Sequence, residues 1–371
     1  MCFKQILINY LNKIKDCRHP SYVKHKLADV LCMMIYAVFC GNDTLCDIFT
    51  YIKDNEEMLQ QEFKIKSIPS KSTLWRILRQ PNSEEIRDII FNIIKFCMKL
   101  KFGNHWAADG KAMRGSTGGN VMTLCMYDTA THSPLAASTI YEKISEMVAL
   151  REIIKSMDLN GIVITGDALH CQKETCKIIT QQGGDYVFSL KGNQPTLHNA
   201  AKEYFEDPET EGDWEMHEGP TEKAHGRIEK RTCYKLTNSE WLKDMFNDWP
   251  GLATIFAIRT YREQSGQDPE ETVSYFITSL DKTPKELMQI KRDHWLIESN
   301  HWSLDKILGE DHCKMQSKDA NIIMNSMRRL SIWFHEKIVK LMNDLQLNIK
   351  ESMKRGERNI GYLKEILSTE F

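Results

Sequence analysis

The segment GIVITGDALHCQKETCKIITQQGGDYVFSL, residues 161–190, contains the alternation on which the predicted fold depends. A short apolar run typical of a buried strand comes first, and a polar stretch with helical spacing follows it and ends at Gly183 and Gly184. A second apolar run then completes a strand–helix–strand unit. The unit predicts two strands of one sheet, with a helix packed against a face of that sheet.

The residues on either side extend this pattern. Three apolar runs separated by Gly, Ser and Pro lie between residues 104 and 143 and are predicted to be strands, and a helix capped by Ser145 follows them. Residues 207–283 interrupt the alternation with three further predicted strands, which we expect to form a β-rich insertion. The resulting order of three strands, helix, strand, helix and strand favours a mixed α/β sheet with flanking helices.

Both ends of the chain are predicted to be helical. Apolar positions at helical spacing cover residues 22–60 and 83–100, and a short helix begins near Ser70 between them. Residues 284–342 contain two long helical stretches. The β-rich insertion therefore lies between two helix-rich parts of the chain.

The composition limits the class of protein. A chain of 371 residues allows two domains, or one large domain with a smaller attachment. Residues 1–104 have a net charge of +5 and residues 314–371 of +4, which leaves −11 for residues 105–313. Basic flanks around an acidic centre suit a protein that holds a polyanion with its ends and cations in its middle, but chance variation along a neutral chain explains the asymmetry equally well.

The cysteines and the hydrophobic pattern lead us to expect a cytoplasmic protein. The eleven cysteines are scattered, with no CxxC pair at zinc spacing, which favours reduced thiols. The first stretch, MCFKQILINYLNKIKD, is amphipathic and interrupted by Lys4, unlike a secretory signal. No apolar run approaches the length needed to cross a bilayer.

Two aspartates are placed where predicted strands end. Asp109 follows a short apolar run, and Asp167 follows the strand that begins at Gly161. Groups at the carboxyl ends of strands face the crevice in which α/β proteins bind ligands. Two carboxylates that meet there repel each other unless a cation compensates them, and a divalent metal is the usual one. The alternative is that each aspartate only caps the turn that follows it.

A late helix carries a third acidic candidate. His294, Glu298, His301 and Asp305 are spaced by four, three and four residues, so they share one face of a helix. Such a stripe is usually a solvated face, but two tryptophans flank this one. The two histidines are candidates for supporting a site. A zinc ion held by them stays open as an alternative, although no spacing signature favours it.

Four motifs, in order along the chain, resemble a known family. They are AADGKAMRGS (107–116), ITGDALHCQKETCKII (164–179) with GGDYVFSLKGNQPTLH (183–198), AHGRIEKR (224–231) and RDHWLIESNHWSLD (292–305). Over almost its whole length, the sequence is similar to the DDE transposases of bacterial insertion sequences, of the H-repeat-associated type. The resemblance implies that the catalytic and metal-binding acids are Asp109, Asp167 and Glu298. His301 and Trp302 depart from the family pattern, because they stand one residue closer to the glutamate.

The resemblance also implies a fold and a domain organisation. The fold would be a ribonuclease H-like mixed sheet with flanking helices and a β insertion before the helix that carries the glutamate. The implied domains are an N-terminal helical, transposase-associated DNA-binding domain (1–100), a DDE catalytic domain (101–340) with its insertion at about 207–283, and a C-terminal helical tail (341–371).

Basic and polar residues near the acids are candidates for binding DNA, since each is placed where phosphates would arrive. They are Lys111, Arg114, Lys191, Asn193, Gln194, His225, Arg227 and Arg231. We expect Gly110 to let the chain turn away from the site. Arg227, Glu229 and Arg231 alternate along one strand face and form either a row that faces DNA or a cross-strand ladder of salt bridges.

The function that the resemblance implies is metal-dependent DNA transposition. Two Mg²⁺ ions, or Mn²⁺, would serve an endonuclease and strand transferase that acts on double-stranded DNA at the terminal repeats and at the target. We expect a homodimer on DNA, no contact with membranes, and action at the nucleoid in the bacterial cytoplasm. Two alternatives stay open, a metal-dependent nuclease without strand transfer and a catalytically inactive DNA-binding protein derived from a transposase.

Overall fold

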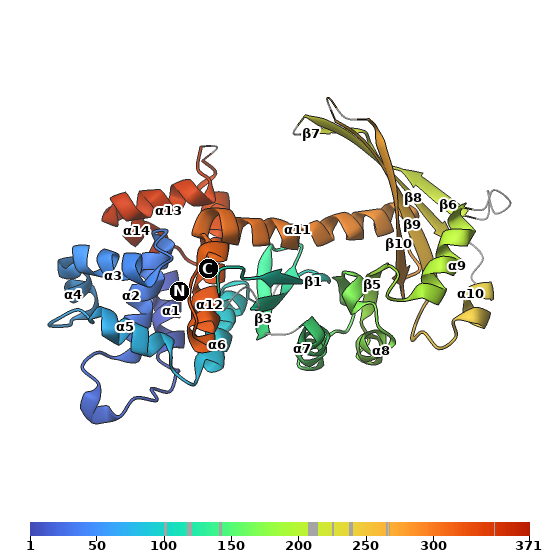
Figure 1. Cartoon of the computed structure of the whole chain (residues 1–371). Coiled ribbons are helices and arrows are strands. Elements are labelled where there is room, and N and C mark those ends of the chain that lie inside the picture. Colours follow the sequence, from blue (N-terminus) through green and yellow to red (C-terminus); the bar gives the residue numbers. More distant parts are fainter. Residues whose placement is uncertain are drawn as a thin grey trace.

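The computed structural model describes residues 1–99, 102–116, 121–140, 143–206, 214–224, 226–236, 240–264, 266, 268–344 and 346–371. A group of helices that contains both termini lies at one end of the molecule, and a curved sheet extends to the other end (Figure 1). The long helix α11, Pro284–Leu308, runs between these two ends (Figure 1).

The helices at the first end come from both ends of the sequence. They are α1 (Phe3–Leu11), α2 (Leu27–Phe39), α3 (Leu45–Asp54), α4 (Glu56–Phe63), α5 (Lys71–Leu78), α6 (Ser83–Cys97), α12 (Lys318–Met342), α13 (Ile349–Arg358) and α14 (Ile360–Leu367), with the short 3-10 helix η1 (Pro20–Tyr22). One hydrophobic cluster joins them. Phe39 stacks on Phe334 with ring centroids 4.6 Å apart, so α2 and α12 share one core. The helical prediction over residues 22–60 is confirmed as three helices, because Gly41, with a φ of +83°, ends α2 and Asn55 separates α3 from α4.

In the part of the chain that the structure describes, the sheet contains ten strands. They are β1 (His105–Ala112), β2 (Met122–Asp128), β3 (Ser133–Ile140), β4 (Val163–Gly166), β5 (Asp185–Leu190), β6 (Trp214–Glu218), β7 (Glu222–Ala224), β8 (Arg227–Leu236), β9 (Thr254–Gln264) and β10 (Glu270–Thr278). Their order is β3-β2-β1-β4-β5-β10-β9-β8-β6, and β7 pairs with β8. β1 is antiparallel to β2 and parallel to β4, and β5 is parallel to β4, so the predicted mixed sheet is confirmed.

Helices cover both faces of the first five strands. The other helices of this part are α7 (Lys143–Lys155), η3 (Ala168–His170), α8 (Lys173–Gln181), α9 (Pro195–Glu206), α10 (Glu240–Met245) and η5 (Glu310–His312). α7 and α8 lie on one face and α11 on the other (Figure 1). Trp106 and Ala108 pack toward α7 and α8, while Ala107 packs against Ile297 of α11, as the alternation along β1 requires. α7 begins two residues before its predicted cap, Ser145.

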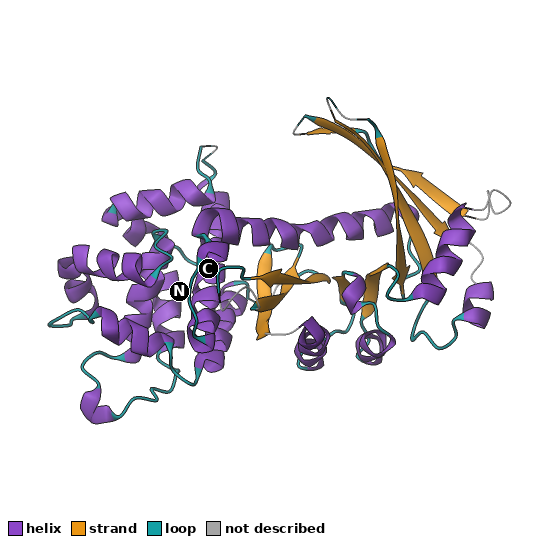
Figure 2. Ribbon diagram, viewed as in Figure 1, coloured by secondary structure: helices purple, strands orange, loops and turns teal. Residues whose placement is uncertain are grey.

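The predicted β-rich insertion extends the main sheet. Its three predicted strands are present as β8, β9 and β10, with β6 and β7 in addition. β10 pairs antiparallel with β5, so the strands continue past the fifth strand and curve away from it (Figure 2). The backbone N–H and C=O groups at the edge of β5 pair with β10. Without β10, β5 would be an open edge with these groups unpaired.

Two further expectations concern the chain as a whole. All eleven cysteines are free thiols, and eight of them are buried, while Cys17 and Cys46 are exposed and Cys2 is half-buried. In the part of the chain that the structure describes, no helix is both long and apolar enough to span a membrane.

Candidate active site

The pairing of β1 with β4 sets the position of two acids. The strands run parallel and are paired up to Ala107 and Thr165, after which β4 ends and β1 continues beside β2 as far as Ala112. Asp109 and Asp167 each follow that last pair by two residues, so they lie at one level where the strands part. The expectation that Asp109 ends its strand is wrong, because β2 still pairs with the residues after it.

The neighbours of Asp109 come from β1 and α11. Nδ1 of His301 lies 3.3 Å from Oδ2 of Asp109. Burial would raise the pKa of Asp109, but the hydrogen bond from His301 and the nearby imidazole of His294 outweigh burial and hold this pKa below its usual value. The expectation that Gly110 turns the chain is wrong, since Gly110 pairs with Leu124 inside β1. Regular sheet therefore holds the backbone of Asp109.

Asp167 follows β4 and caps the short helix η3. Its Oδ1 accepts a hydrogen bond from the backbone N–H of Leu169 at 3.0 Å, so the capping alternative is confirmed for this acid. The side chain is nevertheless 53% exposed, which leaves it accessible to a ligand. Capping and ligand binding are compatible here, because a carboxylate has acceptor capacity to spare.

Glu298 and Lys291 lie two turns apart on α11. Burial raises the pKa of Glu298, and the charge of Asp109 raises it further. Burial lowers the pKa of Lys291 to about 8, while Glu298, Asp167 and Asp109 all oppose that shift. The three acids therefore act on one ammonium group and share one electrostatic environment, although they are far apart in the sequence.

The two histidines of the α11 stripe are buried. Nδ1 of His294 lies 2.8 Å from the hydroxyl of Thr165, and that hydroxyl lies 3.0 Å from Nε2 of His105. Burial lowers the pKa of His294 to about 3 and that of His105 to about 4, so both are neutral near pH 7. The stripe is not a uniform solvated face, and the side chains that α11 exposes include the flanking Trp295 and Trp302.

The donor chemistry of this site fits a hard divalent cation. Three carboxylates offer oxygen ligands of the kind that Mg²⁺ and Mn²⁺ prefer. Among the described residues, no group of three or more His, Cys, Asp or Glu side chains is close enough to hold a metal ion. Asp109, Asp167 and Glu298 therefore do not form a closed cage, and a metal site that they share stays a prediction. The alternative of a zinc site has no support, since His294 contacts Thr165 and His301 contacts Asp109.

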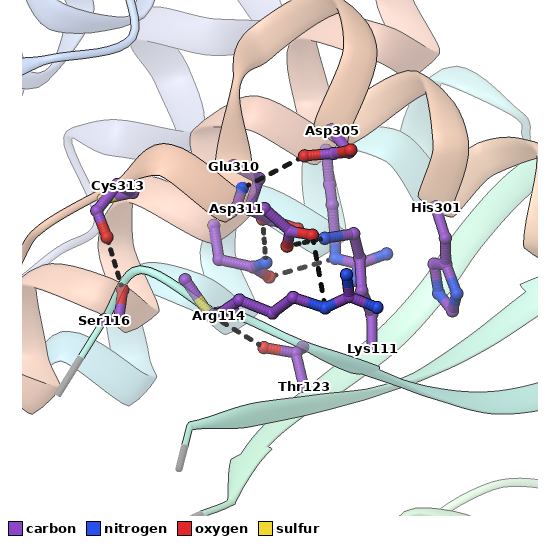
Figure 3. A network of polar contacts seen from close by, with 12 residues as sticks. Lys111, Arg114, Ser116, Thr123, His301, Asp305, Glu310, Asp311 and Cys313 are labelled. Carbon is purple, nitrogen blue, oxygen red and sulfur yellow. Dashed lines mark hydrogen bonds and ion pairs between the residues drawn. The ribbon is translucent and has the colours of Figure 1, made fainter. Parts of the chain in front are cut away.

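Two of the predicted DNA-binding residues follow Asp109 and point toward the end of α11. Nζ of Lys111 lies 2.6 Å from Oδ1 of Asp311 and 3.3 Å from Oε2 of Glu310, as Figure 3 shows for Asp311. Glu310 is fully buried, and Lys111 is only 10% exposed. Arg114 lies 3.8 Å from Asp311 but is 82% exposed. The ammonium group of Lys111 is thus held in internal ion pairs and is not free to bind phosphate. The side chain of Arg114 remains accessible to solvent.

The basic residues of β8 form a ladder of salt bridges, which was the alternative to a row that faces DNA. Arg231 is buried, contacts Glu229, and lies 2.8 Å from Glu222. Arg227 lies 3.4 Å from the same Glu229, and Arg262 of β9 lies 2.8 Å from it. The expectation that Arg231 faces DNA is therefore corrected, because carboxylates already neutralise its charge. Arg227 is 40% exposed, and its contact with DNA stays a prediction.

The remaining candidates follow β5 or lie in the insertion. Lys191 is exposed. Asn193 donates to the carbonyl oxygen of Ala168 at 2.6 Å, and Gln194 donates to that of Cys171 at 2.9 Å. These two amides hold the segment directly after Asp167, so both side chains are occupied within the protein. His225 lies outside the described residues, and its role stays a prediction.

Comparison with known proteins identifies the family of the chain. The family model of the Transposase DDE domain matches residues 91–334, and a second model, described as DDE_Tnp_1-associated, matches residues 8–93. The chain belongs to the DDE transposase family. As a member of this family, it carries its acidic motifs at the end of β4, inside β1 and on α11.

Two relatives cover nearly all of this family member, and a third covers about three quarters of it. "H repeat-associated putative transposase YhhI" of Escherichia coli (strain K12) is 28% identical over 374 residues, which span 98% of this chain and 97% of the relative. "Putative protein YbfL" of the same organism is also 28% identical over 374 residues, with 98% and 97% coverage. "Uncharacterized protein in dhlA 3'region" of Xanthobacter autotrophicus is 32% identical over 288 residues, which cover 74% of this chain and 95% of the relative. The predicted relation to H-repeat-associated transposases is confirmed.

Some residues near these acids were not predicted from the sequence to have a role. Lys291 precedes Glu298 by seven residues, a spacing that places both on one face of a helix, and this signal was available in the sequence. Glu310 and Asp311 gave no periodic signal, because they lie in η5 after α11 has ended. Their role as partners of Lys111 depends on a contact between residues 200 positions apart.

Proposed function

We propose that this family member is a metal-dependent DNA transposase that cuts and joins phosphodiester bonds at the ends of an insertion sequence. The proposal rests on two observations: Asp109, Asp167 and Glu298 all act on the charge of Lys291, and both aspartates follow the last β1–β4 pair by two residues. Carboxylates gathered at the carboxyl ends of parallel strands are suited to binding divalent cations that act on phosphates.

The sheet supports a ribonuclease H-like catalytic domain. Its first five strands have the order β3-β2-β1-β4-β5, with β1, β2 and β3 antiparallel and β1, β4 and β5 parallel. We assign the catalytic domain to residues 101–340, the DNA-binding helical domain to residues 1–100 and a helical tail to residues 341–371. The shared core of α1–α6 with α12–α14 would then fix the DNA-binding helices to the catalytic domain.

The proposed reaction begins with cleavage at the element end. Asp109, Asp167 and Glu298 would hold two Mg²⁺ ions, or Mn²⁺. When bound, such ions supply positive charge that stabilises the entering and leaving oxygens of an in-line displacement at phosphorus. Water is the first nucleophile, and the 3′-hydroxyl that it frees then attacks target DNA. His301 would hold the Asp109 carboxylate in position, and the charge of Lys291 would offset part of the negative charge of the three acids.

Binding to double-stranded DNA would involve a basic groove among the N-terminal helices. The groove has a volume of about 700 Å³, and its lining includes Arg18, Lys24 and Arg76 but, among the described residues, no acidic side chain. Lys24 and Arg76 are exposed, while Arg18 is held by Asp16 at 2.6 Å. Positive charge of this kind supplies sequence-independent affinity for phosphates. We further propose that the protein acts as a homodimer on terminal repeats and target DNA, in the bacterial cytoplasm.

A cleavage and strand-transfer assay tests this proposal. The substrate is a labelled duplex that carries the terminal repeat flanking the gene, with a supercoiled plasmid as target. We expect nicking at the repeat end and joined products in Mg²⁺ or Mn²⁺, and neither product in excess chelator. Full cleavage in chelator would contradict the metal dependence.

The same assay separates the two alternatives. Cleavage without joined products would identify a nuclease that lacks strand transfer. Specific binding of the repeat without cleavage in any metal would identify an inactive DNA-binding protein derived from a transposase. The presence of all three acids favours the active enzyme over the second alternative.

A further inference from the structure

A fourth carboxylate, from α7, lies against the strand that carries Asp109. Glu146 is only 4% exposed. A Cβ atom placed on Gly110 would lie 2.5 Å from Oε1 of Glu146 and 2.8 Å from its Cδ, which is closer than real Cβ contacts allow. The missing side chain of Gly110 therefore makes room for this carboxylate. Successive residues of a strand face opposite sides, so Glu146 approaches β1 from the side opposite Asp109.

A buried imidazole connects Glu146 with Asp167. His170, at the end of η3, is 1% exposed, and its Nε2 lies 3.4 Å from Oε1 of Glu146 and 4.0 Å from Oδ1 of Asp167. Both ring nitrogens are buried and have no hydrogen-bond partner among the residues that the structure describes. A buried imidazole without such a partner is costly, so its position between two carboxylates requires an explanation.

We propose that Glu146 and His170 are positioning residues that set the Asp167 carboxylate for divalent metal binding, an inference that rests on the proposed function. Nε2 of His170 faces both carboxylates, at 3.4 Å from Glu146 and 4.0 Å from Asp167, and Glu146 keeps the imidazole turned toward Asp167. The pair also joins the two sides of the site, because Glu146 packs on the β1 residue next to Asp109 while His170 follows Asp167 by three positions.

This role accounts for features that the three acids alone leave unexplained. Metal-binding carboxylates are oriented by hydrogen bonds from residues behind them, and loss of such a residue typically weakens metal binding or activity by about 10–100-fold. Among the described residues, the backbone N–H of Leu169 is the hydrogen-bond donor to Oδ1 of Asp167. His170 places a donor atom 4.0 Å from that oxygen on the buried side, where a small shift of the carboxylate on metal binding would bring the two together.

The competing explanation is a buried pair that only stabilises the fold. The chain offers a control pair, because Nδ1 of His132 lies 3.1 Å from Oε1 of Glu336 on α12, and among the described residues this pair makes no hydrogen bond or ion pair with Asp109, Asp167 or Glu298. A structural role predicts that both pairs affect thermal stability and that neither affects metal binding. A positioning role predicts that only the first pair affects metal binding.

The test measures Mn²⁺ binding to the full-length protein without DNA, by electron paramagnetic resonance, together with the melting temperature. We expect His170→Ala and Glu146→Gln each to raise the dissociation constant for Mn²⁺ by about 10–100-fold. His170→Gln should recover part of that affinity, because its amide can still donate to a carboxylate. The double variant should bind no more weakly than the weaker single variant, since the two residues act as a unit. His132→Asn and Glu336→Gln should leave Mn²⁺ binding unchanged.

Gly110→Ala provides a second route to the same result. It keeps both side chains of the pair but pushes Glu146 away from β1, so we expect weaker Mn²⁺ binding even if Glu146→Gln fails to fold. Wild-type affinity in His170→Ala and Gly110→Ala, or equal losses in the control pair, would overturn the positioning role and leave the proposed function intact. Absence of saturable Mn²⁺ binding by the wild-type protein would overturn both.

Discussion

The helical core and the candidate site where β1 and β4 part both contain buried side chains, but these side chains differ in kind. In the helical core, Phe39, Trp333 and Phe334 pack among aliphatic side chains, and His335 is hydrogen-bonded on both ring nitrogens. At the sheet, buried carboxylates and imidazoles face each other with contacts longer than good hydrogen bonds. Both regions contain buried polar atoms without a hydrogen-bond partner among the described residues, including those of Arg328 and Arg329 on α12 and of His170 near Asp167. The regions differ in that carboxylates lie next to the imidazoles at the sheet.

The two regions meet at Glu310. Burial would raise the pKa of this carboxyl, but Arg329, Lys111 and Arg328 outweigh burial and hold its pKa below the usual value. Two of these cations come from α12 in the helical core, and Lys111 comes from β1 beside Asp109. Glu310 thus ties the strand of the site to the helices, and variants on either side of it should separate loss of function from loss of stability.

The largest effect should come from Asp109→Asn. We expect the rate of DNA cleavage to fall by roughly 10³-fold or more, because a metal-binding charge is lost where several kcal/mol of transition-state stabilisation are needed. The melting temperature should change little. Asp305→Asn on α11 is the control, since Asp305 accepts from the backbone N–H of Asp311 and lies 3.9 Å from the ammonium group of Lys306. Comparable losses in both variants would show that the site assignment is wrong.

Phe334→Ala should produce the largest loss of stability. Phe334 is fully buried between Phe3 and Phe39, and its removal should lower the free energy of unfolding by about 4 kcal/mol. Urea denaturation measures this change. Trp302→Ala, at a side chain that is 61% exposed, should change stability by less than about 0.5 kcal/mol. Mn²⁺ binding by folded Phe334→Ala should remain, and its loss would mean that the two regions are not separable.

Lys111→Ala should destabilise the protein by about 3 kcal/mol, because it leaves Glu310 buried with one partner fewer. Arg114→Ala should have almost no effect on stability, since Arg114 is exposed. The measurement is urea denaturation of both variants, followed by DNA binding at several salt concentrations. Unchanged stability with a shallower salt dependence in Lys111→Ala would show that Lys111 contacts phosphate instead.

A smaller effect, of about 1 kcal/mol, should distinguish the helical core by its pH dependence. Burial lowers the pKa of His335 to about 3 from a model-peptide value of 6.5, so protonation favours the unfolded chain. The contribution of neutral His335 to the free energy of unfolding is complete above pH 6.5 and is lost as pH falls below that value. Between pH 7.0 and 5.5, the free energy of unfolding should fall by about 1 kcal/mol less in His335→Gln than in the wild type. An identical fall in both would contradict the buried neutral state.

The smallest effect concerns the ladder on β8. We expect Arg231→Ala to lower the melting temperature without changing the salt dependence of DNA binding, because Arg231 is paired internally. Arg227→Ala should make the slope of log affinity against log salt shallower by about 0.9, the value for one phosphate contact on duplex DNA. Lys53→Ala, on α3, serves as a surface control. An unchanged slope in Arg227→Ala would assign the whole row to the fold.

The sequence predicted the regular parts of the molecule better than its contacts. Apolar periodicity was sufficient for the order of β1–β5 with α7 and α8, because strands and helices differ in their hydrophobic period. The same periodicity could not show that β10 pairs with β5, since pairing between distant strands leaves no local pattern. It also placed Asp109 at a strand end, although β2 pairs with three more residues of β1.

The site was predictable only in part for a similar reason. Asp109, Asp167 and Glu298 could be identified from motifs, whereas the function of Gly110 could not, because the carboxylate that it accommodates comes from another element of the fold. Charge alone was misleading at Lys111 and Arg231, whose partners are Glu310 and Glu229. A basic residue near an acidic motif has the same appearance in the sequence whether it binds phosphate or a buried carboxylate.

The most direct test of the central claim is Mn²⁺ binding by Asp109→Asn, Asp167→Asn and Glu298→Gln, each compared with the wild type at equal folded fraction. If the three acids form one metal site, the wild type should bind Mn²⁺ saturably, and each single variant should lose most of that binding, because all three contribute ligands to the same ions. Wild-type affinity in any one of the folded variants would remove that acid from the site and contradict the assignment.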